Sequence, residues 1–226
     1  MNILVVAAHP DDELLGCGGT AARLAREGHS VYISILGEGI TSRHKERAEA
    51  DGSALESLRG ASQRVADLIG AKDLSMHGLP DNRFDSVALL DVIKIVEELV
   101  ARWRPEAVYT HHGGDLNVDH RVLSQAVLTA TRPMKDHPVR DVYMFEIASS
   151  TEWAFQQLAP GFRPNVFVDI SATLGTKLEG MREYESEVRT FPHPRSGEAL
   201  TAIAQRWGSV AGCKAAEAFE LVRSIR

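Results

Sequence analysis

The chain has 226 residues, enough to bury one sizeable core, and with 44% hydrophobic and 25% charged residues its composition is that of an ordinary globular protein. The net charge of −6 and the lack of a basic patch argue against a nucleic-acid partner. No apolar run approaches the ~20 residues of a membrane helix, and no signal-peptide pattern is present, so we expect a cytoplasmic protein. Cys17 and Cys213 lie far apart; free thiols fit a reducing cytosol, with a disulfide as the alternative.

Strands and helices alternate along the sequence. Short β-branched apolar runs predict buried strands, whereas apolar residues at helical spacing predict helices, the first two of which end at Gly28 and Gly70. In chain order, the pattern predicts a strand at 2–8, a helix at 12–27, a strand at 29–36, a loop or mobile lid at 37–51, a helix at 54–69, a short strand at 73–79, an amphipathic helix at 86–103, a strand at 107–110, a helix at 120–131, strands at 142–147 and 165–170, and helices at 171–190 and 197–224. Such alternation implies one α/β domain over residues 1–226, Rossmann-like, with a mostly parallel sheet and helices on both faces.

A cluster of acidic residues and a histidine, His9-Pro10-Asp11-Asp12-Glu13, follows the first predicted strand directly. In open α/β sheets, ligands bind at the carboxyl ends of the strands. Negative charges gathered there destabilise one another unless a cation or a reaction uses them. A helix cap would account for one of the acids, but not for three acids and a histidine. The cluster therefore predicts both the place and the chemistry of a functional site.

A second polar segment, residues 110–121, also follows a predicted strand and should reach the same edge of the sheet. The two segments together supply His9, Asp11, Asp12, His111, His112, Asp115, Asp119 and His120. Imidazole and carboxylate ligands with an open position are typical of catalytic zinc, and iron is the alternative metal. Asp115 and Asp119 are better candidates for supporting or capping groups than for ligands. On its own, His120 would be interpreted as a surface histidine; the first cluster is what favours a metal ligand.

The first cluster and the later Asp119-His120 together resemble the motifs of the PIG-L/LmbE-type zinc-dependent N-deacetylases. Enzymes of this family remove acetyl groups from N-acetylglucosamine-type sugars and their conjugates. The resemblance runs from the first strand through the His120 segment and continues weakly to 212–220, which looks like the family's closing helix. It implies that His9, Asp12 and His120 bind one zinc ion. It also implies that Asp11 is the general base, which takes a proton from the attacking water and returns it to the leaving amine.

One position departs from the family pattern. Many members have a histidine three residues before the last ligand, where this chain has Asn117. That histidine would help to stabilise the oxyanion, whereas an amide NH2 can donate a hydrogen bond but cannot carry charge. Either Asn117 is a weaker catalytic donor, or His111 or His112 takes this role.

Four further residues are candidates for contacts with the substrate, a small amino sugar or its conjugate: Arg59, Asp81, His112 and Tyr184. Each also has an ordinary interpretation, namely a solvated helix face for Arg59, a turn for Asp81, a structural role for His112 and packing for Tyr184. Glu146 and residues 149–153 are weaker candidates for sugar contacts. His193 lies in a proline-bracketed loop that could rim the site of its own chain or of a neighbour, and a homo-oligomer stays open.

Three other functions compete with a deacetylase. The segment Gly16-Cys17-Gly18-Gly19-Thr20-Ala21 mimics a dinucleotide-binding fingerprint, but residues 9–15 separate it from the strand and their acids would repel a phosphate. Helix–sheet packing is the other role for these glycines. A magnesium-binding receiver domain also places paired acids after its first strand, but it would be much shorter and needs no histidine segment. A family member that binds sugar without turning it over is the third alternative, because Asn117 departs from the pattern.

Overall fold

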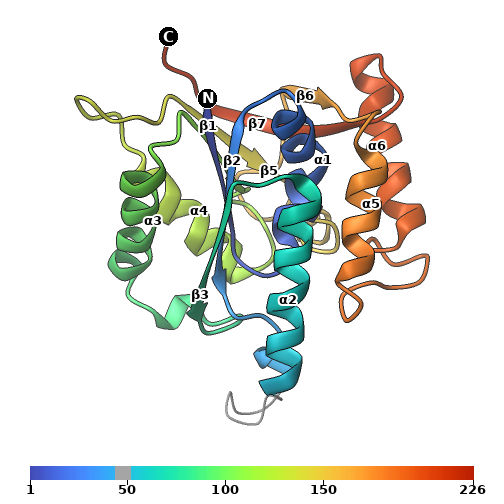
Figure 1. The fold of residues 1–226 in the computed structure, drawn as a ribbon, viewed down its shortest axis with the longest axis horizontal. Coiled ribbons are helices and arrows are strands. Elements are labelled where there is room, and N and C mark those ends of the chain that lie inside the picture. The colour runs from blue at the N-terminus through green and yellow to red at the C-terminus, as the bar shows by residue number, and fades with distance from the viewer. Residues whose placement is uncertain (44–51) are drawn as a thin grey trace.

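A computed structural model describes residues 1–43 and 52–226, whose strands form one seven-stranded sheet (Figure 1). The strands are β1 (Asn2–Ala7), β2 (Ser30–Gly37), β3 (Asp73–Leu79), β4 (Ala107–His111), β5 (Asp141–Phe145), β6 (Val166–Asp169) and β7 (Ala216–Arg223). Their spatial order is β3-β2-β1-β4-β5-β7-β6. β1 to β5 pair in parallel, and β7 runs antiparallel to both β5 and β6. The predicted α/β class with a mostly parallel sheet is confirmed.

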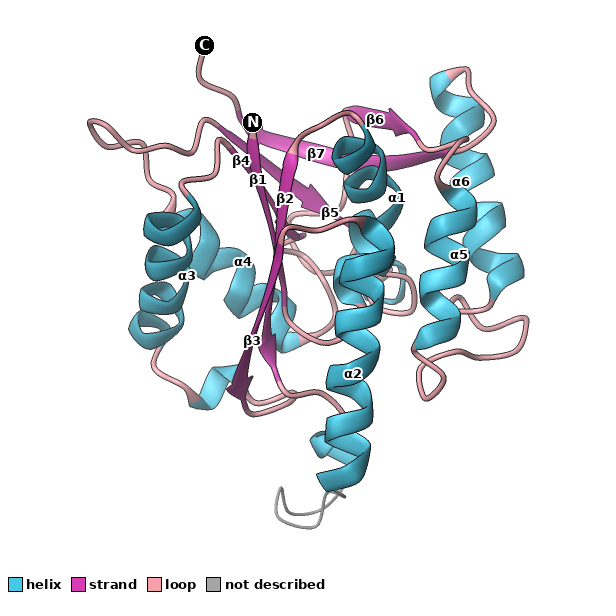
Figure 2. Cartoon of the chain, in the orientation of Figure 1, coloured by secondary structure: helices cyan, strands magenta, loops and turns pink. Residues whose placement is uncertain are grey.

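Helices cover both faces of this sheet, as predicted. They are α1 (Asp12–Arg26), α2 (Gly52–Ile69), α3 (Leu89–Trp103), α4 (Val118–Ala130), α5 (Leu174–Glu183) and α6 (Gly197–Ala211), with short 3-10 turns at Thr41–Arg43, Phe84–Ser86 and Glu152–Ala154. Figure 2 shows α3 and α4 on one side of the sheet and α1, α2, α5 and α6 on the other. None of the helices in the described part of the chain is long and apolar enough to cross a membrane.

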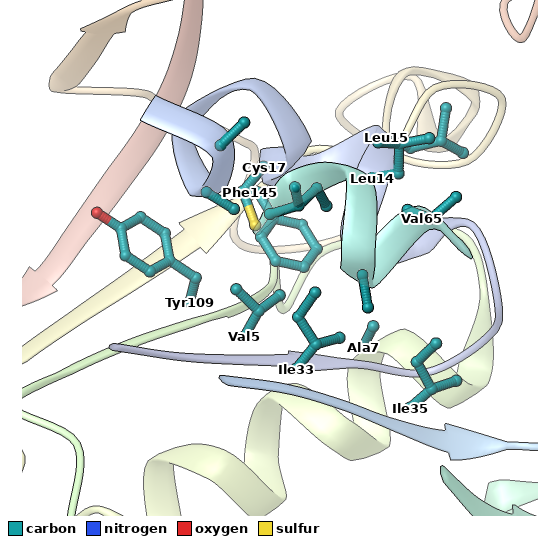
Figure 3. Packing of buried hydrophobic residues seen from close by; sticks show 14 of the residues in the cluster. Val5, Ala7, Leu14, Leu15, Cys17, Ile33, Ile35, Val65, Tyr109 and Phe145 are labelled. Carbon is teal, nitrogen blue, oxygen red and sulfur yellow. The ribbon is translucent and has the colours of Figure 1, made fainter. Parts of the chain in front are cut away.

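The first strand separates two hydrophobic cores because its side chains alternate between the faces of the sheet. Ile3, Val5 and Ala7 pack with residues of α1 and α2, and Figure 3 shows part of this core. Leu4, Val6 and Ala8 pack on the opposite face with residues of α3 and α4. A strand buried on both faces must be apolar along its whole length, which explains the run of residues 3–8. This strand therefore presents its first polar side chains only at its carboxyl end.

Helix α1 is kinked near its middle, where Cys17 has the non-helical angles φ −150° and ψ 21°. Glycines let this helix lie close to its neighbours: a Cβ added at Gly16 would overlap the Phe145 ring, and one at Gly19 would come within 2.9 Å of Ile170. The glycine-rich segment that mimics a dinucleotide fingerprint is thus accounted for by packing.

A buried ion pair holds the two parts of the kinked helix. Lys177 Nζ donates to Leu15 O at 2.7 Å and to Glu217 Oε1 at 2.6 Å. The Glu217 carboxylate in turn accepts from the backbone N–H groups of Gly19 (3.0 Å) and Thr20 (2.7 Å). These are backbone groups that the kink frees from the usual helical pattern, and buried backbone groups need partners. The pair therefore ties α5 and β7 to α1, whose first turn carries the acidic cluster.

The predicted helix at 197–224 is wrong in its second half. Helix α6 ends at Ala211, followed by Gly212 with φ 76°, and residues Ala216–Arg223 form strand β7. The resemblance of 212–220 to a closing helix fails for the same reason. A left-handed glycine ends the helix, and pairing with β5 and β6 on both sides then favours the extended backbone. The predicted helix at 171–190 also proves shorter, spanning Leu174–Glu183.

Smaller predictions at the sequence level have mixed outcomes. Cys17 and Cys213 are free, so the alternative of a disulfide is excluded. Gly28 and Gly70 follow their helices with φ of 89° and 83°, as expected of glycines that end helices. The predicted loop or lid at 37–51 begins with the last residue of β2, and its part from 44 to 51 lies outside the described residues.

Candidate metal centre and active site

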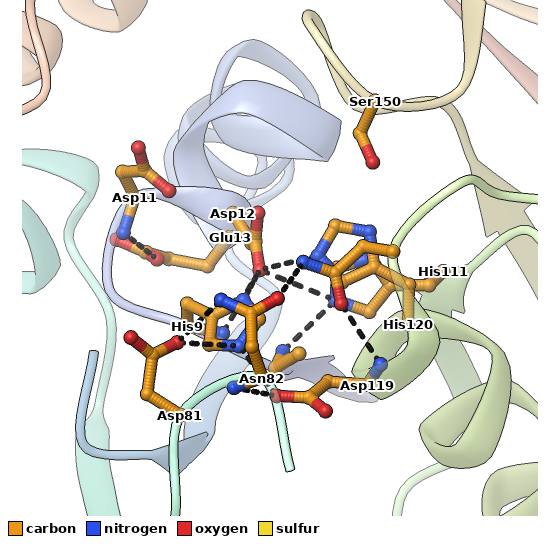
Figure 4. Close-up of polar contacts among 12 residues, drawn as sticks. His9, Asp11, Asp12, Glu13, Asp81, Asn82, His111, Asp119, His120 and Ser150 are labelled. Carbon is orange, nitrogen blue, oxygen red and sulfur yellow. Dashed lines mark hydrogen bonds and ion pairs between the residues drawn. The ribbon is translucent and has the colours of Figure 1, made fainter. Parts of the chain in front are cut away.

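Three potential metal ligands converge at the carboxyl edge of the sheet (Figure 4). His9 follows β1, Asp12 opens α1, and His120 lies in the first turn of α4. His9 Nδ1 and His120 Nε2 each lie 3.2 Å from Asp12 Oδ2, and one atom from each residue falls within 4.8 Å of the others. All three side chains are largely buried. The two segments predicted to meet at one edge do meet there.

The donor set fits a transition-metal ion. His120 Nε2 is buried and has no hydrogen-bond partner, although it lies close to the carboxylate of Asp12. A buried polar atom without a partner is costly, and a shared cation would satisfy both groups. Two imidazole nitrogens and one carboxylate oxygen form a typical three-residue ligand set of catalytic zinc. His9, Asp12 and His120 are therefore the residues that would hold such an ion.

Each of the two histidines contacts a second carboxylate through its other ring nitrogen. His9 Nε2 lies 2.9 Å from Asp119 Oδ2, and His120 Nδ1 lies 3.0 Å from Asp115 Oδ1. For His9, the carboxylate on the far nitrogen fixes the tautomer and leaves the near nitrogen free for a metal. His120 Nδ1 faces Asp115 at this distance without forming a hydrogen bond to it. This arrangement agrees with Asp115 and Asp119 as supporting groups.

Both supporting carboxylates are themselves held by several donors. Asp119 accepts from the backbone N–H groups of Asn82 (2.7 Å) and Phe84 (2.8 Å). Asp115 accepts from Asn117 N at 2.8 Å, from Thr151 Oγ1 at 2.6 Å and from Ser150 Oγ. Hydrogen bonds to the charged form of a carboxylate favour that form. The two histidines therefore face carboxylates that are each held in place by several donors.

The electrostatics at this cluster favour a positive charge. Burial raises the pKa of Asp12, but the charges of His120 and His111 outweigh burial and lower it well below its usual range. Burial lowers the pKa of His120, yet the charge of Asp12 and the contacts with Asp115 and Asp12 raise it to about 9. Both shifts have the direction expected where negative charge on Asp12 favours a positive charge beside it.

Asp11 lies beside the ligand cluster without belonging to it. Its carboxylate is buried, and burial is the main cause that raises its pKa, opposed by the charge of Arg195. Its backbone is left-handed, with φ 102°, and its N–H donates to Glu13 Oε2 at 3.1 Å. Glu13, whose pKa burial raises to about 7, accepts from the hydroxyl of Tyr184 at 2.5 Å. A chain of buried polar groups therefore fixes the backbone of Asp11 in a conformation that few non-glycine residues adopt.

A polar cavity of about 180 Å³ opens at the ligand cluster. Besides His9, Asp11 and His120, its walls include Asp81, Asn82, Asn117, Ser149, Ser150, Glu187 and Arg195. Asp81 accepts from the backbone and hydroxyl of Ser42 and lies 3.3 Å from His9 Nε2. Of the four residues predicted to contact the substrate, Asp81 is the one that lines this cavity.

Arg59, His112 and Tyr184 lie outside the lining of this cavity. Arg59 is exposed on α2 and borders a separate surface hollow. His112 is buried, with Nδ1 3.0 Å from Glu220 and Nε2 2.8 Å from Pro160 O. Tyr184 is 1% exposed and bonds Glu13. The contacts that the structure gives His112 and Tyr184 are structural ones.

Of the three candidates for an oxyanion donor, Asn117 alone lines the cavity. His111 lies below the site: its Nε2 accepts from Ala8 N at 2.9 Å, and its ring stacks on that of His120 at 3.9 Å between centroids. His112 is engaged elsewhere, as described above. Asn117 Oδ1 caps α4 by accepting from Asp119 N at 2.8 Å, and its Nδ2 donates to Asn82 Oδ1 at 2.9 Å. Asn117 is thus both a helix cap and an amide donor at the cavity.

Sequence reasoning missed Arg195, Glu187 and Asn82 as residues of the site. Arg195 Nη1 donates to Asp11 Oδ2 at 2.7 Å and contacts Glu187 Oε2 at 3.2 Å. The only signal in the sequence was the proline-bracketed loop around His193, whose Nδ1 accepts from Arg195 N at 3.1 Å. A lone arginine in a loop shows nothing of its partner until the chain is folded.

The known proteins that this chain resembles include deacetylases and a hydratase. The chain is 27% identical to diacetylchitobiose deacetylase from Thermococcus kodakarensis, over 99% of this chain and 84% of that protein. The structure of N,N'-diacetylchitobiose deacetylase from Pyrococcus horikoshii superposes with a TM-score of 0.78 at 18% identity, covering 98% of this chain and 84% of that one. The structure of GalB, the 4-carboxy-2-hydroxymuconate hydratase of Pseudomonas putida KT2440, also gives 0.78 at 20% identity, covering 100% and 97%. These two superpositions show a shared fold and leave the reaction open.

The match to a family profile extends over more than half of the chain. The PIG-L profile, described as GlcNAc-PI de-N-acetylase, matches residues 4–131. This range contains the three converging ligands, Asp11, Asn117 and both supporting carboxylates. The chain belongs to the PIG-L family.

Proposed function

We propose that this protein is a zinc-dependent hydrolase that removes an N-acetyl group from an amino sugar or an amino-sugar conjugate. The observation that carries the proposal is the convergence of His9, Asp12 and His120 beside the buried Asp11, at the wall of a polar cavity. Membership of a family whose profile is described as a de-N-acetylase supports the reaction. The diacetylchitobiose deacetylase relative supports an N-acetylated sugar as the substrate class.

The metal would supply the Lewis acid of this reaction. When bound to the two histidines and Asp12, zinc would polarise the amide carbonyl and lower the pKa of a water molecule to about 7. Iron is the alternative, because imidazole and carboxylate ligands also suit it.

Asp11 would move the proton. A water oxygen attacks the carbonyl carbon while Asp11 accepts a proton from that water, and the C–N bond then breaks as the same carboxyl protonates the leaving amine. The products are acetate and a free amino sugar. Burial and the neighbouring acids Asp12 and Glu13 raise the pKa of Asp11, which suits a group that must take up a proton and give it back.

Asn117 would donate to the developing oxyanion. Its Nδ2 carries two hydrogens, one of which is used on Asn82 Oδ1. The second hydrogen is available to the cavity that Asn117 lines. A neutral amide stabilises an oxyanion less than a charged histidine does, so we expect a weaker contribution than a histidine would make at this position.

The cavity wall suits a polyhydroxylated ligand. Its lining carries carboxylates, amides and hydroxyls, among them Asp81, Asn82 and Ser149, and little apolar surface. Sugar hydroxyls can donate to the carboxylates and accept from the amides. The same lining would bind an apolar acyl chain poorly, which favours acetyl over longer acyl groups.

The proposal is tested by metal content and by release of acetate. Purified untagged protein and its His120→Ala variant are analysed for zinc and iron, and the protein is then assayed with N-acetylglucosamine and N,N'-diacetylchitobiose. We expect about one metal ion per chain, lost in the variant, and acetate released by the wild type.

A protein that binds no metal even when zinc is supplied would contradict the proposal. Binding of the sugar without turnover would support the inactive sugar-binding alternative instead. Because the hydratase shares the fold, a 4-carboxy-2-hydroxymuconate assay is included, and its turnover without acetate release would overturn the deacetylase.

A further inference from the structure

The cation beside Asp11 comes from a part of the chain beyond the range of the family match. Arg195 lies just before α6, whose N-cap is Ser196, whereas the match ends at residue 131. Its guanidinium reaches back to Asp11, with Nη1 2.7 Å from Oδ2. The Arg195 side chain is 21% exposed and the Asp11 side chain 2% exposed, so this ion pair is screened little by solvent.

Three partners fix the direction of this guanidinium. Besides Asp11, Nη1 contacts Glu187 Oε2 at 3.2 Å, and Nε donates to Ser149 Oγ at 2.9 Å. The backbone N–H of Arg195 donates to His193 Nδ1 at 3.1 Å. Because guanidinium is planar and its donors are rigidly spaced, contacts on two of its nitrogens determine its orientation. The arginine is thus held in place before it meets Asp11.

Asp11 needs such a partner because its other neighbours repel it. Asp12, Glu187 and Glu13 all act on it as negative charges. The hydrogen bond from Asp11 N to Glu13 fixes the backbone, but it does not fix the rotation of the side chain. Without a cation, repulsion would turn the carboxylate away from its acidic neighbours.

The two oxygens of this carboxylate have different surroundings. Oδ2 accepts from Arg195, whereas Oδ1 accepts no hydrogen bond within residues 1–43 and 52–226. One oxygen is therefore anchored and the other is left to exchange a proton. This is the arrangement that a general base requires, since a small misplacement of a catalytic group lowers the rate steeply.

We propose that Arg195 is a positioning residue that holds the carboxylate of Asp11 in the orientation needed for proton transfer. The inference rests on the proposed role of Asp11 as general base. It differs from two simpler roles for the arginine, which are direct binding of the substrate and attachment of the loop before α6.

The test compares zinc-loaded wild type, Arg195→Ala and Arg195→Lys with N,N'-diacetylchitobiose. We expect kcat of Arg195→Ala to fall about 10²-fold while KM changes by less than about threefold, because the loss is one of orientation. Zinc content and Tm should stay near those of the wild type. Guanidinium ion added at millimolar concentration should raise the kcat of Arg195→Ala about tenfold. The kcat of Arg195→Lys should lie between those of the wild type and Arg195→Ala.

A surface arginine provides the matched control. Arg64 pairs with Glu183 at 2.6 Å, neither residue lines the cavity, and Arg64→Ala removes an arginine–carboxylate pair at the surface. Its kcat and KM should match those of the wild type, and guanidinium should have no effect on it. A rise in KM with kcat retained in Arg195→Ala would assign the arginine to substrate binding and overturn the proposal. Parallel losses of zinc, Tm and kcat would assign it to folding and overturn the proposal equally.

A crystal structure of zinc-loaded Arg195→Ala separates this inference from the proposed function. Positioning predicts that the Asp11 carboxylate rotates while His9, Asp12 and His120 stay in place. If the wild type releases no acetate and Asp11 still rotates, the deacetylase is wrong and the positioning role stands. If Asp11 keeps its orientation in the variant, the positioning role is wrong whatever the activity.

Discussion

The two ends of the chain contribute to the site in different ways. Residues 1–131 carry the converging ligands and Asp11, all of them adjoining the carboxyl ends of β1 and β4. The region after residue 170 adds no member to that ligand cluster, but its Arg195 contacts Asp11 and its Lys177 and Glu217 hold the kinked α1. The reactive groups, and the carboxylates of Asp115 and Asp119 beside the two histidines, thus belong to the regular parallel part of the fold. The groups that hold Asp11 and the kinked α1 come from the antiparallel and loop-rich part. The difference predicts the largest losses of activity for variants of the metal ligands and of Asp11 in the first region. Variants in the second region should lower the rate less or lower the stability of the fold.

The largest expected effect comes from loss of the metal. Chelation of the protein, or His120→Ala, should remove zinc and lower acetate release at least about 10³-fold, because a Lewis acid contributes several kcal/mol to this kind of reaction. Added zinc should restore activity after chelation, but not in the variant. Elemental analysis and an acetate assay measure both. His29→Ala, which removes a histidine near the N-terminus and away from the cavity, is the control and should keep its metal. Full zinc content in His120→Ala would refute the ligand set.

The next effect concerns Asp11. Asp11→Asn keeps the shape of the side chain but removes the proton acceptor, so kcat should fall about 10²- to 10³-fold, within the range for general acid–base groups. Zinc content should be unchanged, since Asp11 lies outside the ligand cluster. The measurement is kcat together with metal content in the same preparation. Turnover equal to that of the wild type would mean that another group is the base.

A variant in the second region should act on stability instead. Lys177→Met leaves the buried Glu217 carboxylate without its cation, and we expect the free energy of unfolding to fall by about 3 kcal/mol. Urea denaturation measures this change. Lys94→Met removes a lysine whose partner Glu97 lies at the surface, and this control should change stability by less than about 1 kcal/mol. Equal effects of the two variants would show that the pair does not hold α1.

The same contrast explains what the sequence could predict. The strands and helices from β1 to α4 could be predicted from apolar periodicity, because the hydrophobic pattern of each segment indicates a single type of secondary structure over its full length. The segment 216–223 does not: Ala216, Ala218 and Phe219 are compatible with a helix after α6, and only pairing with β5 and β6 decides for a strand. The glycine at position 212 was the local signal in the sequence that the helix ends there, and its positive φ in the structure agrees with that role.

Candidate site residues divide along the same line. His9, Asp12 and His120 were predictable because neighbouring strand ends bring their segments together whatever the rest of the fold does. Arg195 was not predictable, because its place in the site depends on contact with Asp11, which is distant in sequence. For Tyr184 the sequence did indicate a polar side chain near the site, yet its hydroxyl is directed to Glu13 below the cavity. Helical periodicity indicates that Tyr184 faces the interior of the protein. It does not identify Glu13 as the buried acid that its hydroxyl contacts.

The smallest expected effect is at Asn117, where catalysis and stability can be separated. Asn117→Ala removes both the amide donor and the cap of α4, so kcat should fall roughly tenfold and the free energy of unfolding by about 1 kcal/mol. Asn117→Asp keeps an oxygen that can accept from Asp119 N but lacks the NH2 group, so it should lose kcat and retain stability. Kinetics and urea denaturation on both variants test this separation. If both variants keep the kcat of the wild type, Asn117 is a helix cap alone. The oxyanion would then be stabilised by the metal without help from this amide, and the departure from the family's histidine would have removed a catalytic group without replacing it.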